Sequence, residues 1–110
     1  VVTASLAGVT PYSVDPLYAM SKHAVVGLVR SLAPELATRG INIHALCPGA
    51  VDTPIIPHAQ KTEDARFMSP EALAIDVIEL MTEMESGKSW IRLSETKPRY
   101  VIRAPGDKTA

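Results

Sequence analysis

The 110-residue sequence has one cysteine, Cys47, and few aromatic residues, which make up only 5% of the chain. A single cysteine excludes an internal disulfide framework and a zinc site made of several cysteines, and no metal site is expected. It also favours a reducing, cytoplasmic compartment. Neither sign of charge dominates, because 11 Lys and Arg accompany 12 Asp and Glu. This balance argues against a nucleic-acid-binding protein, whose affinity depends on an excess of cations over the phosphates.

Long hydrophobic runs are also absent. No apolar stretch approaches the roughly 20 residues that span a bilayer, so we expect no membrane segment. No internal repeat or low-complexity tract interrupts the chain. What is present is a 46% hydrophobic sequence that can form a core, at a length that fits one small domain.

The first five residues, Val1–Ser5, resemble the middle of a protein rather than its beginning. They form a short apolar run without alternation, which is typical of a strand buried on both faces of a parallel sheet. No methionine or signal-peptide pattern precedes them. A processed terminus would explain this start, but the strand-like pattern favours a fragment whose front half is missing.

A long helix is predicted from Leu17 to Arg39. The loop before it, residues 8–16, ends in Asp15-Pro16, an N-cap residue followed by proline at the first helical position. Pro34 is expected to kink or interrupt the helix, and Gly40 to end it. Two apolar rows run along this helix, so it should be covered on two sides. One row consists of Tyr18, Lys22, Val25, Val29, Leu32 and Leu36, and the other of Leu17, Met20, Ala24 and Leu28.

The remainder of the chain continues the alternation of strands and helices. Residues 41–47 read as a strand, which completes a βαβ unit with two parallel strands. Ser69-Pro70-Glu71 begins a second helix that Gly87 ends, with an apolar face of Leu73, Val77, Leu80, Met81 and Met84. Residues 89–93 form a third strand, 100–103 a weak fourth strand, 54–69 an irregular surface segment, and 104–110 a flexible tail.

Tyr18 and Lys22 could carry chemistry, because a spacing of four places both on one helix face. A free phenol ionises near pH 10 and is a poor base at neutral pH, whereas a neighbouring cation stabilises the phenolate form. The pair alone favours the simpler interpretation, because most such pairs only cover a helix surface.

Two further segments belong to the same edge of the predicted sheet. Ser5 ends the first strand and Pro48-Gly49 ends the second, and ligands of open α/β sheets bind at the carboxyl ends of the strands. The Ser5 hydroxyl can donate a hydrogen bond to a reacting oxygen, and Gly49 permits close backbone approach. Taken separately, Ser5 could simply hydrogen-bond its own loop backbone, and Pro48-Gly49 could be an ordinary turn.

Together, these segments resemble the short-chain dehydrogenase/reductase family. The similarity extends from Val1 to about Leu93 and is carried by TASLAG at residues 3–8, YAMSK at 18–22 and NIHALCPGAVDTP at 42–54. Ser69-Pro70-Glu71 and Gly87-Lys88 stand where that family begins its late helix and last core strand. The resemblance implies an α/β fold, the C-terminal portion of a doubly wound Rossmann-like parallel sheet, with the whole chain, residues 1–110, as one partial domain.

The resemblance also implies roles for individual residues. Tyr18 would be the general acid and base, Lys22 would assist it and bind the nicotinamide ribose, and Ser5 would orient the substrate oxygen. Pro48, Gly49 and Val51 would line the nicotinamide of NAD or NADP, with the Val51 backbone on its carboxamide, and Thr53 would bond the carboxamide or diphosphate. The implied reaction is hydride transfer between the nicotinamide and a small alcohol or ketone. The family also implies a substrate lid at 54–69, where Tyr12, Ile55, Ile56 and Phe67 could touch substrate, and a homodimer or homotetramer formed through the Tyr18–Arg39 helix.

The glycine-rich turn that holds the dinucleotide diphosphate in this family is not among these residues. The six glycines form no G-x-G-x-x-G pattern. A chain of these residues alone is therefore expected to be inactive. Two alternatives remain: a short non-catalytic chain that serves as an association module, and an unrelated α/β binding module.

The remaining candidate residues favour structural roles. His23 lies on the polar strip of the long helix and is expected to face solvent or an interface. His44 and Cys47 lie on a predicted strand and are expected to be structural, with Cys47 behaving as a small buried hydrophobe.

Overall fold

The computed structural model describes residues 1–51 and 67–106. Its elements are, in chain order, β1 (Val2–Thr3), the 3-10 helix η1 (Leu6–Gly8), α1 (Pro16–Ala37), β2 (Ala45–Pro48), α2 (Pro70–Leu80), β3 (Ser89–Arg92) and β4 (Tyr100–Ile102). Residues 54–66 of the predicted lid and 107–110 of the predicted tail lie outside the described residues.

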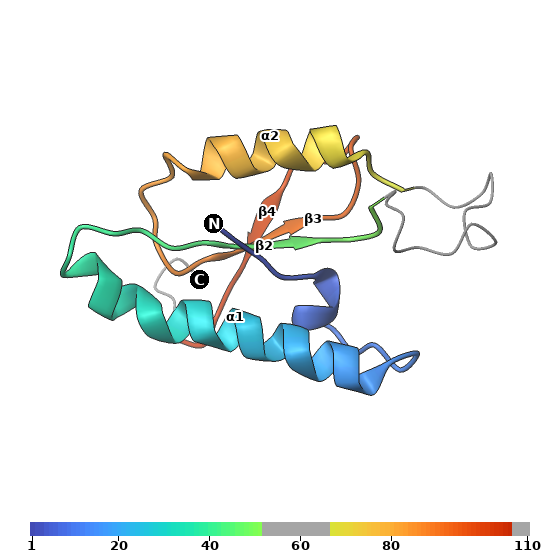
Figure 1. The fold of residues 1–110 in the computed structure, drawn as a ribbon, viewed down its shortest axis with the longest axis horizontal. Coiled ribbons are helices and arrows are strands. Elements are labelled where there is room, and N and C mark those ends of the chain that lie inside the picture. Colours follow the sequence, from blue (N-terminus) through green and yellow to red (C-terminus); the bar gives the residue numbers. More distant parts are fainter. Residues whose placement is uncertain (52–66, 107–110) are drawn as a thin grey trace.

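The four strands form one mostly parallel sheet in the order β1-β2-β3-β4. β1 pairs with β2 and β2 with β3 in parallel, whereas β4 pairs with β3 in antiparallel orientation. The two helices cover opposite faces of this sheet (Figure 1). The predicted βαβ unit is therefore present as β1-α1-β2.

Local capping explains where both helices begin. The Asp15 carboxylate accepts a hydrogen bond from the Tyr18 N–H at 3.1 Å, and Pro16 occupies the first helical position of α1. The Ser69 hydroxyl accepts from the Ala72 N–H at 3.2 Å at the start of α2. Both starts were predictable because the capping residue lies within three positions of the group it bonds.

Pro34 was expected to kink or interrupt the helix; it does not interrupt it, because α1 continues through this residue to Ala37. Val29 and Ala33 are buried just before the proline, and packing of this kind outweighs local helix propensity. The helix ends two residues before the predicted Arg39. Gly40, with φ of 72°, follows it in a left-handed conformation, and the Ile41 N–H donates back to the Leu36 carbonyl at 3.0 Å.

Three other predicted boundaries are also wrong. β1 covers only Val2–Thr3, because the residues after it turn into η1. β2 begins at Ala45 rather than at residue 41, since the Ile43 N–H donates to the Ser86 hydroxyl at 2.8 Å and not to a strand. α2 ends at Leu80, well before Gly87.

The early end of α2 has a physical cause in the segment that follows it. The Glu83 carbonyl accepts a hydrogen bond from Nε2 of His44 at 3.0 Å, so the chain leaves the helix axis to meet the start of β2. His44 is buried and serves this contact, as its predicted structural role requires.

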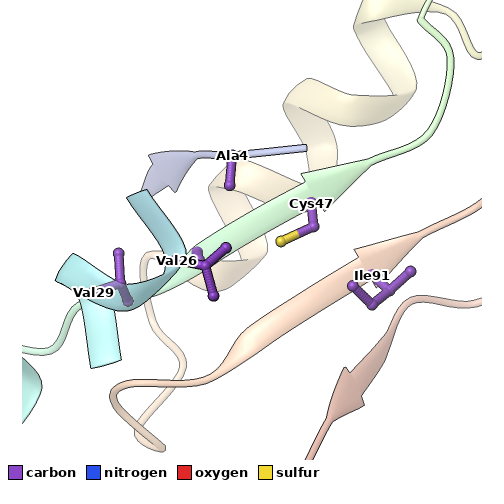
Figure 2. Close-up of a cluster of buried hydrophobic side chains, with 6 residues drawn as sticks. Ala4, Val26, Val29, Cys47 and Ile91 are labelled. Atoms are coloured by element: carbon purple, nitrogen blue, oxygen red, sulfur yellow. The ribbon is translucent and has the colours of Figure 1, made fainter. Parts of the chain in front are cut away.

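One buried hydrophobic cluster lies between α1 and the sheet. Figure 2 shows Val26 and Val29 of α1 beside Ala4 and the strand residues Cys47 and Ile91. Val29, Cys47 and Ile91 have no exposed surface. Burial of an aliphatic side chain of this size contributes about 1.5–3 kcal/mol, so these contacts fix α1 on the sheet.

The helices also carry apolar faces that the described residues do not cover. On α1, Leu17 is 73% exposed, Met20 64% and Leu28 55%, so the described residues leave the second apolar row uncovered. Met81 and Met84, which follow the end of α2, are 72% and 80% exposed, contrary to the predicted apolar face. The position that α2 buries most fully besides Leu80 is instead an acid, Asp76.

Candidate active site

Ser5 lies directly after β1 and caps η1. Its backbone is extended, with φ of −166° and ψ of 157°, and its hydroxyl oxygen accepts from the Ala7 N–H at 3.1 Å. A serine hydroxyl has one hydrogen to donate and a second lone pair in addition to this bond. The local bond therefore orients the side chain and leaves its donor available.

Gly8 brings the turn that follows Ser5 against α1. A Cβ atom added at Gly8 would lie 2.8 Å from the Lys22 carbonyl oxygen and 3.0 Å from Cγ2 of Val26. Only glycine permits this approach, so η1 packs on the helical turn that carries Lys22. In the sequence, Gly8 indicated only a loop, because the partner that requires a glycine is fourteen residues away.

Tyr18 and Lys22 meet on the exposed side of the first turns of α1. The Lys22 Nζ atom is 5.7 Å from the centre of the Tyr18 ring, a cation–π distance. Tyr12, from the preceding loop, packs edge-on against Tyr18 with ring centres 5.9 Å apart. Tyr18 is 42% exposed, so its ring is available to a ligand.

The turn after β2 carries the predicted nicotinamide residues. The Gly49 N–H donates to the Arg92 carbonyl at 2.9 Å, and the Met68 N–H donates to the Ala50 carbonyl at 2.9 Å. Val51 forms an isolated parallel bridge with Met68. The hydrogen bonds of this turn thus run to β3 and to the start of α2. Thr53 lies outside the described residues.

Parallel pairing places Ser5 and Pro48 at the same edge of the sheet, because β1 and β2 both end there. Burial raises the pKa of the Cys47 thiol, opposed by the Ser5 backbone N–H and by the charge of Arg30. Cys47 therefore stays protonated beside this edge and is no candidate nucleophile. His23 is exposed and its ring bonds back to Ala19 of the same helix at 2.8 Å.

Two hollows accompany these residues. One of about 140 Å³ lies beside the β2 turn and is lined by Phe67, Met68, Ser94, Glu95 and Thr96. The other, of about 360 Å³, lies between the second half of α1 and the turn at Ser86–Lys88, away from Tyr18. The predicted site is an open edge of the sheet rather than either hollow.

The sequence profile of the short chain dehydrogenase family matches residues 1–64 of this chain. The chain belongs to the short-chain dehydrogenase/reductase family. Its mostly parallel sheet corresponds to part of the Rossmann fold of that family, and family membership implies a nicotinamide dinucleotide, NAD(P), as cofactor.

Individual relatives agree with this assignment. The chain is 45% identical over 62 residues to 15-hydroxyprostaglandin dehydrogenase [NAD(+)] of Bos taurus. The aligned residues make up 54% of this chain and 23% of that protein. The crystal structure of acetoin dehydrogenase from Salmonella typhimurium superposes with a TM-score of 0.70 at 32% identity, covering 84% of this chain and 40% of that one. The fold also matches 4-hydroxyisoleucine dehydrogenase complexed with NADH, with a TM-score of 0.65 at 21% identity.

The chain therefore spans about a quarter of the curated relative and 40% of the first solved structure. Among the described residues, no helix has the length and hydropathy that crossing a bilayer requires.

Proposed function

We propose that these residues form the C-terminal, catalytic part of an NAD(P)-dependent enzyme that interconverts an alcohol and a ketone. The observation that carries the proposal is the close approach of Gly8 to the Lys22 carbonyl, which joins the Ser5 turn to the helical turn carrying Lys22 beside Tyr18. The edge that Ser5 shares with Pro48-Gly49 supports it. Relatives named as dehydrogenases of hydroxylated compounds support the reaction class.

In this proposal Tyr18 transfers a proton to or from the substrate oxygen. Lys22, whose Nζ atom is 5.7 Å from the centre of the Tyr18 ring, places a positive charge beside this side chain and offers donors to the ribose hydroxyls. Ser5 donates its free hydroxyl hydrogen to the same substrate oxygen, where charge develops during the reaction. Tyr12, beside Tyr18, forms an apolar wall for the substrate.

The turn after β2 suits the nicotinamide end of the cofactor. Gly49 lets this turn lie close against the end of β3, because a Cβ atom there would be 3.2 Å from the Leu93 carbonyl oxygen, and Val51 presents its backbone to the carboxamide. When bound, the nicotinamide supplies or accepts the hydride. The diphosphate would need a glycine-rich turn that these 110 residues do not contain.

Substitution Tyr18→Phe in the longer protein tests the proposal. Removing a general acid and base should lower kcat by about 10²–10⁴-fold while cofactor binding is kept. Tyr100→Phe is the matched control, because Tyr100 has a similar exposure of 46% but lies on β4. Turnover measured with a panel of alcohols decides the matter, and wild-type kcat in Tyr18→Phe would overturn the assignment.

A second candidate function is association without catalysis. The exposed row of Leu17, Met20 and Leu28 on α1 favours it, because an apolar helix face of this kind suits a partner helix. In the enzyme the same face of α1 would join subunits of a homodimer or homotetramer. The encoding reading frame separates the two functions: an upstream glycine-rich turn supports the enzyme, and a start codon just before Val1 supports the association module.

A further inference from the structure

Asp76 is a charged residue in a place where burial makes charge costly. It lies on α2 with 2% of its surface exposed, and an isolated buried carboxylate is strongly disfavoured. Two arginines balance the negative charge of the Asp76 carboxylate. Arg99 donates to Oδ1 at 3.0 Å, and Nε of Arg92 lies 3.3 Å from Oδ2 as an ion pair without hydrogen-bond geometry.

The three residues join three elements. Asp76 belongs to α2, Arg92 is the last residue of β3, and Arg99 precedes β4 (Figure 1). Arg99 also donates to Glu79 at 2.9 Å and stacks over Trp90 at 5.5 Å. Buried ion pairs are poor sources of net stability, because desolvation offsets their attraction, so stability alone is a weak account of this cluster.

The backbone of Arg92 leads from this cluster to the candidate site. Arg92 is in register with Pro48, and its carbonyl accepts the hydrogen bond from the Gly49 N–H. A Cβ atom at Gly49 would lie 3.2 Å from the carbonyl oxygen of Leu93, so the turn sits tightly against the end of β3. The position of the Arg92 backbone therefore sets the position of Gly49.

A second set of contacts connects the Pro48–Val51 turn to the residues at the start of α2. The Met68 N–H bonds the Ala50 carbonyl, and Ser69, the N-cap of α2, donates its N–H to the Glu95 carboxylate. This bond lowers the pKa of Glu95, whose carboxylate is thus the favoured form. α2 and the end of β3 consequently define the turn from both directions.

We propose that Asp76 is a positioning residue: by fixing Arg92 it holds the Pro48–Val51 turn in the conformation that receives the nicotinamide. The consequence for the cofactor rests on the proposed function. The coupling of Asp76 to the turn does not, because it depends only on contacts within the chain.

Substitution Asp76→Asn in the full-length protein tests the coupling, with Glu79→Gln as the matched control. Both changes replace an acid by its amide on α2, and both contact Arg99, but only Asp76 contacts Arg92. We expect amide hydrogen exchange at Gly49 to accelerate about tenfold in Asp76→Asn, the size of a typical coupling between sites. Exchange at Leu46, inside β2, should change much less, and Glu79→Gln should change neither amide.

The kinetic readout distinguishes positioning from loss of fold. Asp76→Asn should raise KM for the dinucleotide about tenfold with kcat within about twofold of wild type, since the turn binds the cofactor but transfers no proton. Loss of active protein would lower the apparent kcat instead. Unchanged Gly49 exchange in a folded Asp76→Asn protein would overturn the proposal.

If Asp76→Asn fails to fold, the double substitution Asp76→Leu/Arg92→Leu provides the test. Apolar replacement of a buried ion pair is often neutral for stability, and Arg99 keeps Glu79 as a partner. Wild-type protection at Gly49 in this variant would overturn the proposal, and accelerated exchange would support it. A wild-type protein that binds no dinucleotide would instead refute the proposed function, while the exchange result still decides the coupling.

Discussion

Ile91 and Ile75 are the same side chain in opposite surroundings. Ile91, on β3, has no exposed surface and packs in the cluster between α1 and the sheet, whereas Ile75, on α2, is 58% exposed. Truncation of a buried isoleucine removes its transfer energy and leaves a cavity.

We expect Ile91→Ala to lower the free energy of unfolding by about 2–5 kcal/mol. Ile75→Ala should stay within about 0.5 kcal/mol of wild type, as surface substitutions do. Urea unfolding followed by circular dichroism measures both. A large loss at Ile75 would contradict the expectation and mean that another surface covers this side of α2.

Residue roles could be predicted only where the partner is close in sequence. Asp15 and Ser69 were identified as N-caps because each bonds an N–H three residues away. Asp76 was not singled out in the sequence, because its partner Arg99 lies 23 residues further along the chain. No local pattern indicates such a pair.

At the scale of the elements, two glycines occupy sites with opposite demands. Gly27 is inside α1, and a Cβ atom there would meet nothing within 4 Å. Gly87 has φ of 83°, and its Cβ atom would lie 2.8 Å from Cβ of Ala33. The first site tolerates a side chain, and the second excludes one.

Gly27→Ala should therefore raise the free energy of unfolding by about 1 kcal/mol, because alanine is the better helix former. Gly87→Ala should lower it by at least about 1–2 kcal/mol, the cost of a left-handed conformation for a residue with a Cβ atom. Thermal unfolding of the two variants against wild type provides the comparison. A destabilised Gly27→Ala would show that a neighbouring surface approaches α1 at this point.

Element types were predictable from hydrophobic periodicity, whereas element ends depended on distant contacts. The bond from His44 to Glu83 connects residues 39 positions apart and accompanies the early end of α2. Pro34 was overridden by the burial of its neighbours. The exposure of Met81 follows from the same early end, because the periodic pattern extends beyond the helix that forms.

For the whole molecule, the topology determines which candidate residues can meet. The shared strand-end edge of Ser5 and Pro48 could be predicted, since parallel strands end together. The contact of Gly8 with Lys22 and the dependence of Gly49 on β3 could not, because both rest on backbone distances that appear only after folding.

A chain limited to these 110 residues should bind NAD(H) and NADP(H) weakly and oxidise no alcohol measurably. It has no G-x-G-x-x-G turn to hold the diphosphate, so only the nicotinamide end would have contacts. Titration followed by nicotinamide fluorescence, together with an alcohol oxidation assay, checks this. Turnover by the purified chain would contradict it.

The two faces of the sheet are stabilised by different chemistry, and this has a thermal consequence. The α1 face rests on a buried aliphatic cluster that includes Val29 and Ile91, whereas the α2 face includes the carboxylate of Asp76 between two guanidinium groups. Hydrophobic attachment weakens on cooling, while the desolvation penalty of buried ions falls on warming. Cooling should therefore weaken the packing of α1 on the sheet first, whereas moderate heating should leave the ion-pair contacts between α2 and β3 intact.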